Sequence, residues 1–407
     1  MKYVILLGDG MADYPVAALR GKTPLAVAHT PNMDKIATDG SLGLIETIPP
    51  GFQPGSDVAN LTVLGYDPSR SYTGRGPLEA ASLGIQLTDD DVAFRCNLVT
   101  LGSGPYPVME DFTAGHISSE ESRQIMIDLN AAIGSETFQF HPGVSYRHLV
   151  VWRKGEGSMK TVAPHDITGR AIEYFVPSGP GAGEIIALME QGKKILSEHP
   201  VNNMRRSAGK RPANAIWLWG QGRAPRIIKL TDHYGIRGGV ISAVDLLNGI
   251  GTYAGLEVIH VEGMTGYIDT NYRGKVLGAL HALKDMDFVF LHVEAPDEMG
   301  HEGNLEGKIH AIEDFDRQVV GPVMDGLAYL GPFRIMVLSD HPTPLSIKTH
   351  AADPSPFAVL SSEVGENRTD GTAFSEEAAR RTGLLFSPGY KLIAPFIRDW
   401  RSAIAKP

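Results

Sequence analysis

Three apolar runs of strand length each lead to an aspartate. A continuous apolar run is typical of a strand buried on both faces, as in a parallel sheet. Ligands of open α/β sheets bind beyond the carboxyl ends of such strands, so we expect the three aspartates at one edge of one sheet. The runs are residues 3–8 before Asp9, residues 288–293 before Asp297, and residues 334–339 before Asp340.

Strand-like runs alternate with helix-like segments through most of the chain. This alternation predicts the α/β class, with a doubly wound, mostly parallel sheet. Further strands are expected at residues 42–47, 215–219 and 256–261, and helices at residues 58–64, 239–250, 274–283 and about 305–330. Thr30 before Pro31 is expected to be the N-cap of another helix, since proline suits the first helical position.

Residues 89–212 differ in character from the sequence on either side. Short strand-like runs lie there among polar turns and helices, which is typical of a smaller α+β module. We therefore predict that this segment is a domain inserted into an α/β domain formed by residues 1–88 and 213–407. Its clearest predicted elements are strands at residues 92–99 and 148–152 and a helix at residues 184–196.

Composition excludes several classes of protein. The 407 residues are 43% apolar and 21% charged, and their net charge of −10 argues against a nucleic-acid-binding protein. The single cysteine, Cys96, excludes an internal disulfide framework and favours a reducing cytoplasm. No apolar run approaches the roughly 20 residues that span a bilayer, so no membrane association is expected. The oligomeric state is left open.

Histidines accompany the strand-end aspartates. Any one of these residues alone would commonly be a hydrogen-bonded structural group, but together they supply three carboxylates and three imidazoles. Mixed oxygen and nitrogen ligands suit Mn²⁺, Zn²⁺, Fe or Co. Six ligands are too many for one catalytic ion and suit two ions about 3.5–4 Å apart. The predicted ligands are Asp9, Asp297, His301, Asp340, His341 and His350.

Ser56 is the candidate nucleophile. It follows a loop rich in proline and glycine (residues 49–55) and precedes a helix-like run. A serine at such a turn exposes its hydroxyl beside backbone N–H groups that favour anions. A bound ion would activate that hydroxyl. The alternative is a simple N-cap serine, and both remain open from this segment alone.

Phosphoryl transfer relies on positioning and charge neutralisation, so cationic side chains are expected near such a site. Each candidate could equally be a surface or salt-bridge residue. The candidates are Arg75, Arg95, Arg147, Arg170 and Lys275.

Several motifs resemble those of a known superfamily. They are residues 8–10 (Gly-Asp-Gly), 30–34 (Thr-Pro-Asn-Met-Asp), 54–57 (Pro-Gly-Ser-Asp), 72–80, 241–247, 297–301, 340–341 and His350. This set is similar to the alkaline phosphatase superfamily. Within it, the whole chain resembles the archaeal-type cofactor-independent (2,3-bisphosphoglycerate-independent) phosphoglycerate mutases, which also occur in bacteria.

The resemblance implies how the ions are shared. One ion would be held by Asp297, His301 and His350, and the other by Asp9, Ser56, Asp340 and His341. Ser56 would be phosphorylated in passing. Mn²⁺ is the expected metal, with Mg²⁺, Zn²⁺ or Co²⁺ as alternatives, and 2,3-bisphosphoglycerate would not be needed. The inserted domain would be a cap that closes over the substrate by a hinge rotation.

Two substrates remain open at this point. The first expectation is a cytoplasmic phosphoglycerate mutase of glycolysis and gluconeogenesis, whose small phosphorylated substrate is 3- or 2-phosphoglycerate. The alternative is a homoserine kinase-like phosphotransferase, because residues 111–117 and 164–167 resemble a sister group of proposed homoserine kinases. Those segments add His116, His165 and Asp166 to the substrate-binding candidates. A non-catalytic, metal-stabilised structural protein is a third reading.

Overall fold

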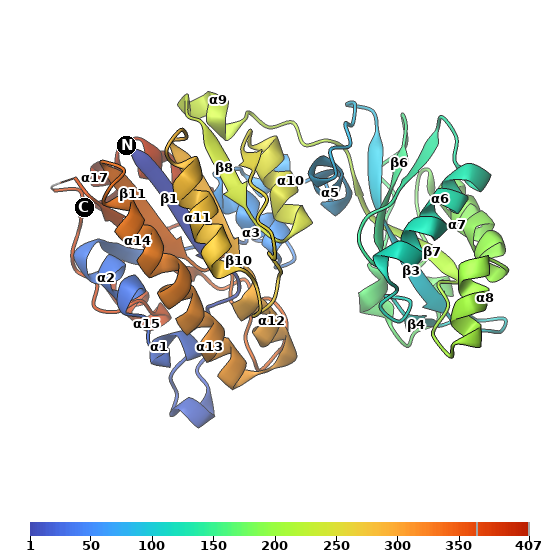
Figure 1. Cartoon of the computed structure of the whole chain (residues 1–407), viewed down its shortest axis with the longest axis horizontal. Coiled ribbons are helices and arrows are strands. Elements are labelled where there is room, and N and C mark those ends of the chain that lie inside the picture. Colours follow the sequence, from blue (N-terminus) through green and yellow to red (C-terminus); the bar gives the residue numbers. More distant parts are fainter. Residues whose placement is uncertain (364, 406–407) are drawn as a thin grey trace. The chain divides into compact units, whose positions relative to one another are not determined.

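The computed structural model describes residues 1–363 and 365–405 and divides the chain into two compact units. The first unit comprises Met1–Tyr72 and the chain from Ile227 onward, and the second comprises Thr73–Arg226. Both are shown in Figure 1, and each is described by itself below.

The described part of the first unit contains an eight-stranded sheet in the order β13-β2-β12-β11-β1-β10-β8-β9. All neighbouring strands are parallel except that β12 is antiparallel to both β11 and β2. The predicted α/β fold with a mostly parallel sheet is confirmed. The strands are β1 (Lys2–Gly8), β2 (Ser41–Ile45), β8 (Gly238–Ile241), β9 (Glu257–Val258), β10 (Phe288–Val293), β11 (Phe333–Leu338), β12 (Ser355–Ser361) and β13 (Leu385–Phe386).

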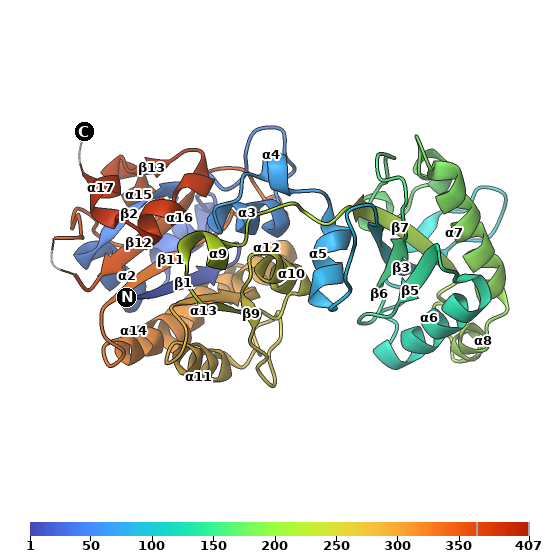
Figure 2. The ribbon, with the colours of Figure 1, turned by 90° about the horizontal axis from the view of Figure 1, so that it is seen from above.

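Alternating side chains of these strands bury two apolar faces. Val4 and Leu6 of β1 belong to the larger core, where the sheet packs against several helices. Figure 2 shows three of these helices, α11, α13 and α14, on one side of the strands. The helices of this core are α2 (Pro31–Asp39), α11 (Tyr272–Ala282), α13 (Leu305–Phe315) and α14 (Gly321–Leu327). Shorter helices of the unit include α1 (Pro24–Val27), α4 (Pro68–Ser71), α9 (Leu230–Tyr234), α16 (Ile393–Ile397) and α17 (Trp400–Ile404).

The second unit is built on an antiparallel five-stranded sheet in which β3 pairs with β4, β6 and β7, and β6 pairs with β5. Helices α6 and α7 cover one face, and Ala80 of α5 packs on the other. The elements are α5 (Arg75–Ser82), β3 (Val92–Leu101), β4 (Met109–Asp111), α6 (Ser119–Ile133), β5 (Phe138–His141), β6 (Arg147–Trp152), α7 (Ala182–Ser197), α8 (Pro200–Ser207) and β7 (Ala215–Gly222).

The domain boundaries predicted at residues 89 and 212 both lie inside the second unit, which runs from Thr73 to Arg226. On one side, α5 packs against Ala93 of β3. On the other, β7 pairs with β3, so the strand predicted at residues 215–219 belongs to this sheet and not to the parallel one. An apolar run indicates a strand but does not say which sheet it joins.

Local expectations also needed correction. Residues 239–250, predicted as one helix, divide into the end of β8 and the helix α10 (Asp245–Tyr253). Only residues Glu257–Val258 of the strand predicted at 256–261 pair, as β9. The predicted long helix at about 305–330 is present, but a π-helical turn, Asp316–Val320, separates α13 from α14.

The π-helical turn also explains how α2 begins. Thr30 is the N-cap residue of α2, but its side chain makes no capping hydrogen bond within the described chain. The carboxylate of Asp316 replaces it, accepting hydrogen bonds from Met33 N at 2.7 Å and Asn32 Nδ2 at 2.8 Å. A contact between residues so far apart leaves no local sign in the sequence. No helix among the described residues has the length and apolarity to cross a membrane.

His148 in β6 gives the second unit a predicted acid sensitivity. Burial lowers the pKa of its imidazole from 6.5 to about 3. Below about pH 6.5 the unfolded chain therefore binds a proton at His148 that the folded chain does not bind. The free energy of unfolding falls as pH drops from about 6.5 toward 3, by about 1.4 kcal/mol per pH unit. We expect His148→Asn, whose amide oxygen can still accept the Gly143 N–H, to reduce the stability difference between pH 7 and pH 5 by about 2 kcal/mol. Denaturant unfolding at both pH values checks this, and an unchanged difference would contradict it.

Candidate active site

The six predicted metal ligands and Ser56 gather at one edge of the parallel sheet. Strand β1 lies between β10 and β11, and all three run in the same direction, so their carboxyl ends adjoin. Strand β12 runs the opposite way, with Phe357 beside Leu338, and therefore begins where β11 ends. Asp9 follows β1, Asp297 lies in α12 (Ala295–Glu302) just after β10, and His350 precedes β12.

The structure brings the six predicted ligands together in two groups of three. Within each group one potential ligand atom per residue lies within 4.8 Å of the others. In the first group, His341 Nε2 is 3.5 Å from both Asp9 Oδ1 and Asp340 Oδ2. In the second, Asp297 Oδ2 is 3.1 Å from His301 Nε2. The groups are Asp9, Asp340 and His341, and Asp297, His301 and His350.

The electrostatics of the first group favour a bound cation. Asp9 is fully buried, and burial together with the carboxylates of Asp340 and Asp297 raises the pKa of its carboxyl well above the ordinary value. Its Oδ1 atom has no hydrogen-bond partner in the described part of the chain. A buried, unpaired carboxylate oxygen facing other carboxylates is costly unless a cation binds it.

In the second group, the pKa of the aspartate is shifted in the opposite direction. Burial would raise the pKa of Asp297, but its hydrogen bonds with His301 and His350 outweigh burial and hold the pKa well below the ordinary value. Asp297 in turn raises the pKa of His301 to about 9. A carboxylate flanked by two imidazoles is a donor set that suits a transition-metal ion.

Ser56 is the first residue of α3 (Ser56–Val63), and Gly55 is the N-cap. The N-cap alternative for Ser56 is therefore wrong. Its hydroxyl oxygen lies 3.1 Å from His341 Nε2 and 3.4 Å from Asp9 Oδ2, at the first group of ligands. One turn along α3, Asn60 Nδ2 donates to the Ser56 carbonyl at 2.8 Å and to Asp340 Oδ2 at 3.0 Å. This amide ties the serine to the group.

Thr343 fixes the protonation of His341. Its hydroxyl donates to Asp297 Oδ1 and lies 3.2 Å from His341 Nδ1. Because the hydroxyl proton is used on Asp297, Nδ1 carries the imidazole proton and donates to Thr343. The other nitrogen, Nε2, is then unprotonated and faces Ser56 Oγ, where it can accept the hydroxyl proton or bind a cation.

Lys308 contacts the loops that follow β1 and β11. It is fully buried in α13, and its ammonium donates to Asp13 Oδ2 and to the Thr343 carbonyl, each at 2.7 Å. Sequence reasoning missed Asn60, Thr343 and Lys308, which act through long-range contacts. His292 is another buried residue that the sequence prediction missed, although a polar residue within the apolar run 288–293 is a recognisable signal.

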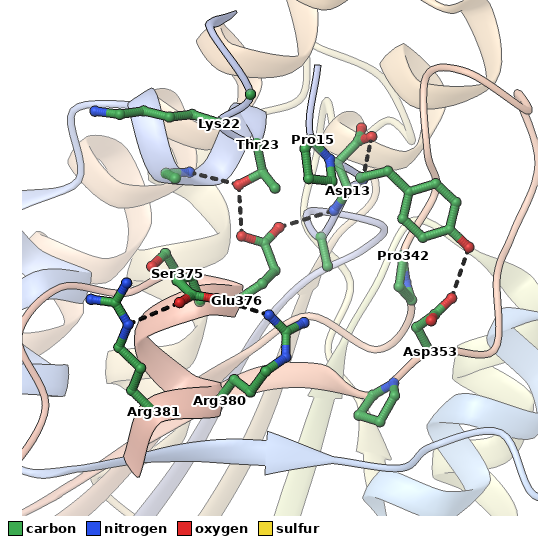
Figure 3. A pocket seen from close by; sticks show the side chains of 16 residues that line it. Asp13, Pro15, Lys22, Thr23, Pro342, Asp353, Ser375, Glu376, Arg380 and Arg381 are labelled. Carbon is green, nitrogen blue, oxygen red and sulfur yellow. Dashed lines mark hydrogen bonds and ion pairs between the residues drawn. The ribbon is translucent and has the colours of Figure 1, made fainter. Parts of the chain in front are cut away.

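A cavity of about 530 Å³ lies against the outer side of these loops, lined by residues that include Asp13, Pro342 and Asp353. Figure 3 shows Glu376, at the start of α15 (Glu376–Thr382), between Thr23 and Asp13. Its carboxylate accepts hydrogen bonds from Thr23 Oγ1 at 2.7 Å and Asp13 N at 3.0 Å. These bonds join α15 to the loop that follows β1.

Four of the predicted substrate-binding candidates, three arginines and one histidine, lie together in the second unit. Arg95 is 8% exposed, with its guanidinium 4.5 Å from the ring centre of Trp219 and Nε 3.1 Å from Glu79 Oε1. Burial lowers its pKa, the Glu79 carboxylate opposes this, and two further arginines lower it again. His165 packs edge-on against the same indole. The four are Arg75, Arg95, Arg147 and His165.

The remaining candidates are placed differently. His116 lies edge-on to Tyr146, the side chain of Asp166 is 66% exposed, and Arg170 packs over Phe175. Lys275 is buried in the first unit, where its ammonium donates to the His292 carbonyl at 3.0 Å. Burial lowers the pKa of Lys275 to about 8.

Comparison with known proteins adds to this geometry. Residues 37–202 match the family model described as 2,3-bisphosphoglycerate-independent phosphoglycerate mutase. A Geobacter sulfurreducens protein named "Probable 2,3-bisphosphoglycerate-independent phosphoglycerate mutase" is 54% identical over 97% of this chain and 98% of its own length. The phosphoglycerate mutase of that name from Methanosarcina barkeri is 52% identical over 94% and 96%. The chain belongs to this family.

Solved structures agree with the family assignment. A Pyrococcus horikoshii protein, PH0037, is 32% identical with a TM-score of 0.82, covering 100% of this chain and 98% of that one. The cofactor-independent phosphoglycerate mutase from Thermoplasma acidophilum is 27% identical with a TM-score of 0.66, covering 97% and 98%. Both structures therefore align with this chain along nearly its whole length.

Proposed function

We propose that this protein is a metal-dependent phosphoglycerate mutase that works through a phosphoserine at Ser56, without 2,3-bisphosphoglycerate. The phosphoryl group leaves the 3-oxygen of 3-phosphoglycerate for Ser56 Oγ, and the 2-oxygen of the retained glycerate then takes it. The observation that carries the proposal is the position of Ser56 Oγ, 3.1 Å from His341 Nε2 at a cluster of buried carboxylates in a member of this family.

The donor set fits two divalent ions, one at each group of three residues, with Ser56 completing the first group. Mn²⁺ suits these mixed carboxylate and imidazole ligands, with Mg²⁺, Zn²⁺ and Co²⁺ as alternatives. When bound, the ions would neutralise charge on the transferring phosphoryl group and favour the deprotonated serine. The unpaired Asp9 Oδ1 is the atom that most needs such a cation.

The chain's own residues orient the nucleophile. Asn60 holds the Ser56 carbonyl and Asp340 together, which fixes the first turn of α3 relative to the ligands. Thr343 holds His341 in the tautomer in which Nε2, the nitrogen that faces Ser56 Oγ, is unprotonated. The clustered arginines of the second unit, Arg75, Arg95 and Arg147, are proposed to bind the substrate's anionic groups. A lone, buried Cys96 suits the cytoplasmic location we propose.

Replacing Arg95 with methionine should raise the KM for 3-phosphoglycerate by about 10–100-fold, because a hydrogen bond to a charged group contributes about 1.5–3 kcal/mol. Arg153→Met is the matched control, since Arg153 in the same unit pairs with Asp91 (Nη1 to Oδ2, 2.7 Å) and is not one of the three clustered arginines. Steady-state kinetics of both variants check this. Equal KM values in the two would contradict a role for Arg95 in binding.

The activity itself is tested by two parallel assays of the purified protein. We expect interconversion of 3- and 2-phosphoglycerate with no added 2,3-bisphosphoglycerate, and no ATP-dependent phosphorylation of homoserine. The homoserine kinase alternative finds no support among the relatives described above. Phosphorylation of homoserine without mutase activity would overturn the proposal.

A further inference from the structure

His292 connects three neighbouring strands at the edge that carries the site. It is fully buried in β10, where it lies beside Leu7 of β1. Its Nε2 atom is 2.8 Å from Asp9 Oδ2. Its Nδ1 atom is 3.1 Å from Oγ of Ser242, the residue that follows β8. The imidazole therefore bridges the end of β8 and the end of β1.

The Asp9 carboxylate determines which nitrogen of His292 carries the proton. A carboxylate oxygen can only accept a hydrogen bond, so Nε2, 2.8 Å from Asp9 Oδ2, carries the imidazole proton and donates it. The other nitrogen, Nδ1, is then an acceptor, and the Ser242 hydroxyl donates to it while its oxygen accepts a hydrogen bond from Val244 N at 3.0 Å. In the other tautomer, a lone pair on Nε2 would face the carboxylate.

This arrangement leaves the two oxygens of Asp9 in different situations. Oδ2 accepts the His292 proton at 2.8 Å, whereas Oδ1 is buried with no hydrogen-bond partner in the described chain. We propose that His292, held by Ser242, is a positioning residue that fixes Asp9 so that Oδ1 is presented to a cation of the first group. The inference rests on the proposed metal site and adds two residues that do not bind the metal themselves.

The competing interpretation is that His292 only fills space in the core and stabilises β10. The two interpretations differ in what its loss does to metal binding. A purely structural histidine would lower the stability of the fold and leave both metal affinities alone. Loss of a hydrogen-bonding partner of a metal ligand typically costs about 10–100-fold in metal affinity. That loss should be confined to the ion held with Asp9.

Three variants separate the contributions. His292→Leu removes both hydrogen bonds, and Ser242→Ala removes only the hydrogen bond to Nδ1. His292→Gln keeps an amide N–H that can reach Asp9 and should recover much of the lost affinity. The matched control is His199→Leu in the second unit, because His199 is also buried and hydrogen-bonded to an aspartate (Nε2 to Asp128 Oδ2, 3.0 Å).

The experiment is a titration with Mn²⁺ alone of the full-length protein from which a chelator has removed all metal. Calorimetry and electron paramagnetic resonance of free Mn²⁺ monitor the binding. Wild type and His199→Leu should bind two ions. His292→Leu should bind one ion with unchanged affinity and the other about 10–100-fold more weakly. Ser242→Ala should show a smaller loss at the same ion, and His292→Gln should lie nearest wild type.

The outcomes distinguish a failure of the inference from a failure of the proposed metal site. Wild-type affinity for both ions in His292→Leu and Ser242→Ala would overturn the inference while leaving the proposed metal site intact. Failure of the wild type to bind two ions would instead refute the metal site, and the inference with it. Circular dichroism and thermal unfolding report whether each variant folds. If His292→Leu does not fold, Ser242→Ala and His292→Gln decide the result by the same titration.

Discussion

Replacing Ser56 with alanine should abolish phosphoryl transfer while leaving the fold and most of the bound metal in place. We expect kcat to fall by about 10⁴-fold or more, because no other group at the site can carry the phosphoryl group between the two half-reactions. The fold should persist since Gly55, and not Ser56, is the N-cap of α3. Steady-state mutase assays, elemental analysis and thermal unfolding check the three parts of this result.

A true N-cap serine provides the matched control. Ser118 is the N-cap of α6 in the second unit, where its hydroxyl accepts a hydrogen bond from Glu121 N in a capping box. Ser118→Ala should cost about 1 kcal/mol of stability and leave turnover unchanged. The opposite pattern is expected for Ser56→Ala. Near-normal turnover in Ser56→Ala would refute the covalent mechanism.

Replacing any one of Asp297, His301 or His350 with alanine should remove one of two bound ions and nearly all activity. These side chains form a single group, with His301 Nε2 and His350 Nε2 3.0 Å apart beside the Asp297 carboxylate. Losing one of three protein ligands leaves an incomplete coordination sphere. Elemental analysis of the purified, dialysed variants measures the loss directly.

The control for these variants is His310→Ala on α13. His310 also pairs with an aspartate one helical turn away, with Nε2 3.4 Å from Asp314 Oδ2, but this pair lies outside both groups of candidate ligands. Its metal content and activity should equal those of the wild type. Two ions per chain in all three ligand variants would show that Asp297, His301 and His350 do not share an ion.

The positions of the candidate ligands were predictable because chain direction alone determines them. A buried strand reads as an apolar run, and parallel neighbours end at one edge, so Asp9, Asp297 and Asp340 could be placed together from the sequence. Ser56 could be placed at a turn before a helix, but whether it capped that helix depended on the backbone of Gly55.

What could not be predicted depends on contacts between distant segments. The strand β7 carries an apolar run that would suit either sheet, and only its pairing with β3 decides the boundary of the second unit. Asp316 replaces Thr30 in capping α2 from more than 280 residues away. His292 is a polar residue in an apolar strand, but its partners Ser242 and Asp9 come from two other strand ends.

The central claim is that the phosphoryl group resides on Ser56 during turnover, and trapping it there is the most direct measurement. Wild-type enzyme would be mixed with ³²P-labelled 3-phosphoglycerate, without bisphosphoglycerate or ATP, and quenched in acid during turnover. We predict label in the proteolytic peptide that contains Ser56, located on that residue by mass spectrometry and absent when metal is first removed by a chelator. Active enzyme that turns over without labelling this peptide at any quench time would contradict the claim.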